Sequence, residues 1–146
     1  MEICRYYLTG TVVAFNVNGL NVLSNHVNAF PTVNSNEGNA YNACNEHFTA
    51  PVDGIYYFSA QICVYDSGSR HDGYFAIENG QCKPKRGGIA LTFTYRNNQS
   101  SSASSSVKLT RNEQVWVSIK VVNPGSLMYV HSNYWNTFTG TLIQDL

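Results

Sequence analysis

Serine, histidine and aspartate side chains, the groups of a hydrolase triad, stand close together between Asp66 and Asp72. Adjacency along the chain is not the geometry of a triad, because the three groups must converge in space. The sequence also has no GxSxG elbow, no HExxH motif and no phosphate-binding glycine loop. We therefore predict no enzymatic activity, and we interpret the segment as an exposed loop whose Asp66, Arg70 and His71 can contact a ligand.

A second segment, residues 131–136, combines aromatic and polar side chains between two expected strands. Carbohydrate binding needs a planar aromatic face and fixed polar groups to meet the hydroxyls. Trp135 has two interpretations, a ligand platform or a hydrophobic lid over the end of the domain. The loop polar groups likewise serve either as ligand contacts or as ordinary solvated residues. The candidate ligand-binding residues are Trp135, Tyr134, His131, Asn133, Arg70, His71, Asp66 and Arg96.

The acidic side chains do not form an evident metal site. Calcium takes six to eight oxygen ligands, and the aspartates at 53, 66, 72 and 145 are scattered along the chain. Asp53 precedes Gly54 in a turn, where its carboxylate has a local role. We predict neither a cofactor nor a metal, and calcium stays an open alternative.

The four cysteines, at positions 4, 44, 63 and 82, lack the spacing of a zinc site. Cys63 falls on the mixed face of an expected strand and is predicted to be a free thiol, either buried or interfacial. An antiparallel return would place Cys44 nearer Ser59 or Ala60, so Cys44 and Cys63 are predicted not to pair. Cys4 is either a link between subunits or a reduced residue near the terminus.

Composition narrows the class of protein further. Charged residues make up 12% of the chain and hydrophobic residues 43%, which is a folded composition. Nine basic and nine acidic side chains cancel, and the one dense basic stretch is 83–86, so nucleic acid is not an expected partner. No apolar run reaches the ~18 residues of a membrane helix, so we expect no membrane insertion, and the first twenty residues lack a leader pattern.

Alternating apolar residues are the main structural signal, with the clearest runs at Ile89–Tyr95 and Ile55–Tyr65. Turn signals such as Asn18-Gly19, Asn79-Gly80 and Gly87-Gly88 separate the runs. This pattern predicts an all-β, two-sheet antiparallel jelly-roll sandwich, as a single domain over residues 1–146 with a lead-in at 1–10. The asparagine-rich stretch 21–45 and the serine-rich stretch 100–106 are predicted to be loops, with the far end of the serine stretch joining a strand at Val107 and Leu109.

Three blocks of the sequence resemble the complement C1q globular-head family of the C1q/tumour necrosis factor-like superfamily. The first carries its signature, Phe30, Asn36, Tyr41, Phe48, Gly54, Tyr56 and Phe58, within which Ala60 replaces the usual Phe or Tyr. The others are VKLTRNEQVWV (107–117) and TFTGTLI (137–143). The resemblance implies a secreted jelly roll that packs as a homotrimer. Some members hold calcium near the trimer axis.

Two aromatic residues bear on that assembly. Tyr57 lies on the face of its strand opposite Tyr56 and Phe58, so it either contacts a partner subunit or packs under a loop. Trp116 matches the Val-Trp segment of the family and is expected in packing or at a subunit interface.

The function we expect is recognition of carbohydrates or microbial surface patterns, with three weak sites on one trimer gaining avidity. The alternative is a cytokine-like or assembly module that binds a protein receptor in the grooves between subunits. A purely structural trimeriser is a third hypothesis.

Overall fold

The alternation of apolar residues is realised most fully in the central strand, β6 (Gly54–Tyr65). Successive side chains of a strand point to opposite faces, and on β6 the two faces differ sharply in burial. Tyr57 is 39% exposed, whereas the residues that alternate with it are at most 1% exposed: Tyr56, Phe58, Ala60 and Ile62. One face of β6 therefore lies in the core and the other is turned outward.

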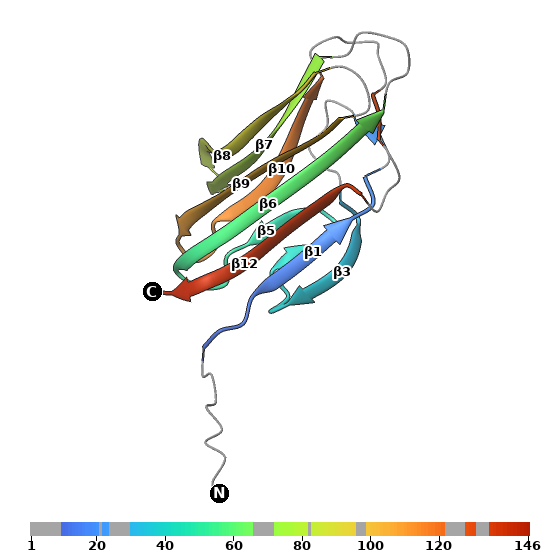
Figure 1. Ribbon diagram of the computed structural model, residues 1–146. Helices are drawn as coiled ribbons and strands as arrows, with labels where there is room; N and C mark the ends of the chain where they lie inside the picture. The colour runs from blue at the N-terminus through green and yellow to red at the C-terminus, as the bar shows by residue number, and fades with distance from the viewer. Residues whose placement is uncertain are drawn as a thin grey trace, which may run out of the picture.

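The computed structural model describes residues 10–20, 22–23, 30–65, 72–81, 83–95, 99–121, 128–130 and 135–146 (Figure 1). Twelve strands lie within these ranges. The other eleven are β1 (Ala14–Asn18), β2 (Val22–Leu23), β3 (Thr32–Glu37), β4 (Tyr41–Asn42), β5 (His47–Thr49), β7 (Asp72–Gln81), β8 (Lys83–Tyr95), β9 (Gln99–Leu109), β10 (Gln114–Val121), β11 (Met128–Val130) and β12 (Thr137–Asp145).

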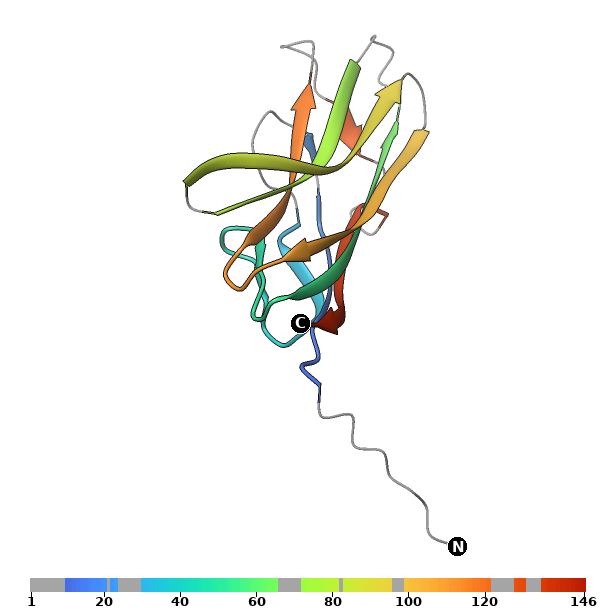
Figure 2. The same ribbon diagram turned by 90° about the vertical axis from the view of Figure 1, so that its left-hand side faces the viewer.

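The described strands form two antiparallel sheets, sheet A and sheet B. Sheet A has seven strands in the order β2-β11-β6-β12-β1-β3, with β9 paired along β6. Sheet B has five strands in the order β4-β5-β10-β7-β8. The two views show the sheets stacked on one another, with sheet A in front in Figure 1 (Figure 2). The predicted two-sheet antiparallel jelly roll is confirmed.

An aromatic cluster fills the space between the sheets and is centred on Phe15 of β1. Its ring centroid lies 5.0 Å from that of Phe138 in sheet A. Towards sheet B it lies 5.1 Å from Tyr41 and 5.5 Å from Phe48, both stacked. Buried aromatic pairs at such distances stabilise a core by about 0.5–1.5 kcal/mol beyond their area. Phe15 thus connects the two layers directly.

Polar contacts fix the chain around Tyr41. The Asn36 side chain donates to the Tyr41 carbonyl (2.8 Å) and accepts from the Tyr41 N–H (3.1 Å). The Tyr41 hydroxyl donates to the carbonyl of Phe30 (2.8 Å). Burial, reinforced by the negative charge of Glu46, raises the pKa of this phenol, which keeps it protonated as the donor. The signature residues Phe30, Asn36 and Tyr41 therefore form one connected unit.

The serine-rich stretch is not a loop, and that prediction is wrong. Residues 100–106 belong to β9, which pairs with β6 from Gly54↔Leu109 to Val64↔Gln99. Serine favours turns when considered alone, but here its backbone is bonded along a long central strand. Ala103 faces the core, while its neighbours Ser102 and Ser104 are exposed. Small hydroxyl side chains are therefore the solvent face of an ordinary strand.

The asparagine-rich stretch and two glycine pairs also differ from expectation. Strands β2, β3 and β4 lie within residues 21–45, where we predicted a loop. Asn79-Gly80 and Gly87-Gly88 lie inside β7 and β8, where the register between these strands shifts. Such irregularities accommodate glycine within a strand. Asn18-Gly19 does leave β1 as predicted, with Gly19 at φ +101°.

The substitution of Ala60 leaves the core closed. Ala60 is 1% exposed, and its partners in the ladder are Phe138 on one side and Ala103 on the other.

The described part of the chain contains no helix long and apolar enough to cross a membrane.

Gly140 of β12 lies where no side chain fits. A Cβ atom there would collide with the Phe15 ring and lie 2.7 Å from ring atoms of Phe58. We expect Gly140→Ala to lower the free energy of unfolding by about 1–3 kcal/mol through overpacking, measured by chemical denaturation. Gly10→Ala is the matched control, since nothing lies within 4 Å of that position. Equal stability of the two variants would contradict the Phe15-centred core.

Candidate ligand-binding and assembly surfaces

Trp135 is the one predicted ligand residue that the described part of the chain includes. The other seven candidates lie outside the described residues: Tyr134, His131, Asn133, Arg70, His71, Asp66 and Arg96. Trp135 directly precedes the segment leading into β12, as expected for a loop between strands. Its side chain is 63% exposed. A tryptophan folded over the sandwich as a lid would be covered, so the lid interpretation is wrong.

The backbone carbonyl of Trp135 is fixed by contacts with β6, although the side chain is exposed to solvent. The Gln61 side-chain amide donates to the Trp135 carbonyl (3.3 Å), and the Cys63 thiol contacts the same oxygen (3.7 Å). Both side chains come from β6, which is anchored in the centre of sheet A. A large aromatic side chain on a fixed backbone loses little entropy on binding, which suits an anchor for a ligand.

A buried contact between Asn136 and Cys63 fixes the chain next to Trp135. Asn136 is fully buried, and its side-chain oxygen accepts from the Cys63 N–H (2.6 Å). Ser100 of β9 donates to the Cys63 sulfur (2.5 Å). Cys63 is 5% exposed and free, and Cys44 is also free and exposed. The prediction that these two cysteines do not pair is confirmed. Sequence reasoning missed the link to Asn136, since it joins residues 73 positions apart.

The outer face of sheet A is covered by small hydroxyl side chains. In the ladders β9-β6-β12, residues paired across the strands share a face, and Tyr57 pairs with Ser106 and Thr141. We call this surface the hydroxyl face. Its members are Ser100, Ser102, Ser104 and Ser106 of β9, Ser59 of β6, and Thr137, Thr139 and Thr141 of β12.

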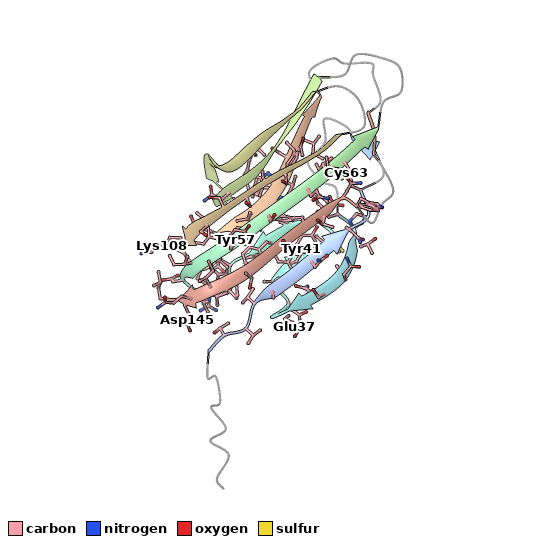
Figure 3. All side chains as sticks on the ribbon, viewed as in Figure 1. Glu37, Tyr41, Tyr57, Cys63, Lys108 and Asp145 are labelled. Carbon is pink, nitrogen blue, oxygen red and sulfur yellow. The ribbon has the colours of Figure 1, made fainter. Side chains whose placement is uncertain are left out.

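Tyr57 stands within the hydroxyl face and is 39% exposed. Figure 3 shows it on the central strand β6, with Lys108, Glu37 and Asp145 toward the edges of the sheet. The alternative that Tyr57 packs under a loop is therefore wrong. Among the described residues of this face, no charged side chain interrupts the serines and threonines. Protein interfaces have the same arrangement, with few charges at the centre and aromatic residues enriched there.

The outer face of sheet B carries a different cluster. Trp116 of β10 is half-buried, and its ring lies 4.9 Å from that of His47 in β5. Glu78 of β7 is the ladder partner of Trp116. This placement agrees with the expected packing role of Trp116. Sequence reasoning missed its neighbours, because His47 and Glu78 are brought beside it only by strand pairing.

Acidic residues of the described part do not converge on a metal. Within the described ranges no group of three histidine, cysteine, aspartate or glutamate side chains could hold an ion. The Asp53 carboxylate accepts from the Arg111 N–H (2.7 Å), and the Asp53 carbonyl accepts from the Leu146 N–H (3.0 Å). Asp53 therefore connects the β9–β10 turn to the residue that follows β12. Its role extends beyond the local turn that the sequence indicated.

Comparison with known proteins agrees with this architecture. The C1q domain family model matches residues 13–143. The chain belongs to the C1q domain family.

Individual relatives place the chain within that family. It is 31% identical over 116 residues to human complement C1q tumor necrosis factor-related protein 2, and 31% identical over 116 residues to the mouse protein of that name. Each match covers 78% of this chain but 38% of the human and 36% of the mouse protein.

Solved structures share the fold at low identity. The globular domain of zebrafish complement 1qA protein superposes with TM-score 0.63 at 19% identity, covering 92% of this chain and 99% of that one. Murine APRIL gives 0.70 at 12% identity, with 90% and 99% covered. Eiger TNF from S. frugiperda gives 0.63 at 11%, with 94% and 96% covered.

The two described cysteines differ in accessibility, which alkylation can measure. In the native protein we expect iodoacetamide to modify Cys44 and to spare Cys63, as read by peptide mass spectrometry. Asn136→Ala removes the acceptor of the Cys63 N–H, at a cost of about 1–3 kcal/mol, and should raise the rate at Cys63. Asn34→Ala, which removes an exposed hydrogen bond to Asn16, is the control. Equal native rates at both cysteines would contradict this arrangement.

Proposed function

We propose that the protein is a secreted, homotrimeric C1q-type module that acts by binding and recognises a protein partner. The observation that carries the assembly is the hydroxyl face, an uncharged surface of small side chains with Tyr57 exposed on its central strand β6, between Ser106 and Thr141. Small side chains allow another subunit to approach closely, and Tyr57 supplies aromatic area. C1q/TNF-like domains commonly trimerise and bind protein partners, which supports this assignment.

Trp135 is the anchor for the partner in this proposal. Tryptophan is enriched among the residues that dominate binding energy at interfaces. Here its side chain is open while Gln61 and Cys63 hold its carbonyl. The similarity to complement C1q tumor necrosis factor-related proteins and to APRIL and Eiger favours a cytokine-like partner over a sugar. No cofactor is included in this proposal.

Assembly through the hydroxyl face is tested with a charge at its centre. Ser104 is exposed and pairs with Ser59, so Ser104→Arg should place an unpaired charge in the subunit interface. We expect this variant to sediment as a monomer in analytical ultracentrifugation, with an unchanged β-sheet spectrum. Thr110→Arg introduces the same charge at an exposed turn and should remain trimeric. A trimeric Ser104→Arg protein would place the interface elsewhere.

Carbohydrate or microbial-pattern recognition is the second candidate function. The exposure of Trp135 favours it specifically, because an open indole can cover the apolar face of a pyranose. In a trimer, weak sites of this kind gain avidity on a repetitive surface. Glycan binding would require calcium only if the ion, and not the protein side chains alone, held the glycan.

One labelled trimer can separate the two candidates. It is applied to an array of extracellular receptor domains and to a glycan array, with and without a chelator. We expect binding to a receptor domain that free monosaccharide does not compete and that Trp135→Ala weakens at least tenfold, about 1.4 kcal/mol, while the trimer stays intact. Glycan binding that is competed by monosaccharide and lost in Trp135→Ala would support the second candidate. Full retention by Trp135→Ala would remove this residue from the site.

A further inference from the structure

Trp116, His47 and Glu78 lie together on the outer face of sheet B. Phe48, Val115 and Ile77 are fully buried, so the residues that alternate with them along β5, β10 and β7 face outward. Trp116 pairs with Glu78, and such directly paired residues have Cβ atoms about 4.5–5.5 Å apart. His47 lies on the other side of the indole, with its ring 4.9 Å away.

Toward the side chains that the structure describes, these three residues have unused hydrogen-bonding capacity. The His47 Nδ1 contacts the Asn45 carbonyl, which can only accept, so Nδ1 is the donor of this contact. In the tautomer with its proton on Nδ1, Nε2 is an acceptor. Among the described residues, neither the Glu78 carboxylate nor the Trp116 indole N–H has a hydrogen-bond partner. Two acceptors and one donor thus lie around a half-buried aromatic ring.

From this arrangement we infer that Trp116, His47 and Glu78 form a binding subsite for one neutral or amino pyranose unit. A pyranose has an apolar C–H face that packs on an indole, and hydroxyls that both donate and accept. Its hydroxyls donate to Glu78 and His47 Nε2 and accept from the Trp116 N–H. The carboxylate repels anionic sugars, so a neutral or cationic unit is favoured. Gly88, the partner of Glu78 in β8, adds no side chain beside it.

The subsite is independent of the protein-binding role assigned to Trp135. The outer face of sheet B points away from the hydroxyl face of sheet A, since the two sheets enclose the core between them (Figure 2). In a three-fold assembly the hydroxyl face of one subunit meets a different surface of the next subunit. The subsite stays open in every subunit when that second surface lies off the outer face of sheet B. Each single site is weak, and several on one particle act together on a glycan-bearing surface.

The test uses the 146-residue chain labelled with 5-fluorotryptophan, which gives one fluorine resonance for each of its two tryptophans. Trp116→Phe and Trp135→Phe assign the two signals. The probes are methyl α-D-mannopyranoside, methyl β-D-galactopyranoside and N-acetyl-D-glucosamine. We expect at least one to shift the Trp116 signal saturably with a Kd of about 1–10 mM, while the Trp135 signal stays in place.

A matched pair of variants locates the effect. Glu78→Gln should weaken the sugar affinity about tenfold, whereas Glu37→Gln, which changes an exposed carboxylate of β3, should leave it unchanged. If Glu78→Gln unfolds, His47→Phe keeps a ring but removes the acceptor and should weaken affinity similarly.

No shift with any probe up to about 100 mM, far above a millimolar Kd, would overturn the inference. So would a shift confined to Trp135, or equal affinities of Glu78→Gln and Glu37→Gln. None of these results bears on the trimer or the receptor, which Ser104→Arg and Trp135→Ala test.

Discussion

The contact of Phe15 with aromatic rings from both sheets is the constraint on which the rest of the molecule depends. Phe15 lies against Phe138 within sheet A and against Tyr41 and Phe48 from sheet B. Because its side chain must point inward, the strands of sheet A that flank β1 alternate in phase with it. Gly140 leaves the room that this ring occupies. The identity of the outward residues, including Tyr57, follows from that phase.

Sequence predicted the part of the fold that depends on periodicity. The alternation in 55–65 and the signature from Phe30 to Phe58 correspond to the buried face of β6 and the aromatic cluster. The serine stretch was misjudged because local propensity was weighed without its partner. Seven consecutive residues of low strand propensity are strand here, since β6 offers backbone hydrogen bonds along their whole length.

Sequence could predict only the part of the candidate site that depends on the type and position of a single residue. Trp135 could be identified from its type and its place between strands, and its exposure agrees with a platform. Its carbonyl is held by Gln61, which lies 74 positions away in the sequence. The neighbouring Asn136 binds Cys63, which lies 73 positions from it. Register and burial set those distances, and neither can be derived from composition. The same holds for Glu78 and His47 beside Trp116.

The direction of β12 separates the ends of the molecule. This strand begins next to Trp135 and runs nine residues to Asp145, a span of about 30 Å. Asp145 pairs with Gly54, and Ala14 at the start of β1 pairs with Thr141 at the middle of β12, so that the chain before Ala14 continues along the second half of that strand (Figure 1). A polypeptide stalk or fused tag attached before Ala14 or after Asp145 would consequently emerge from the end of the domain opposite Trp135. Grafted upright on a solid support by such a stalk, the module would keep its tryptophan pole turned toward the bulk solution.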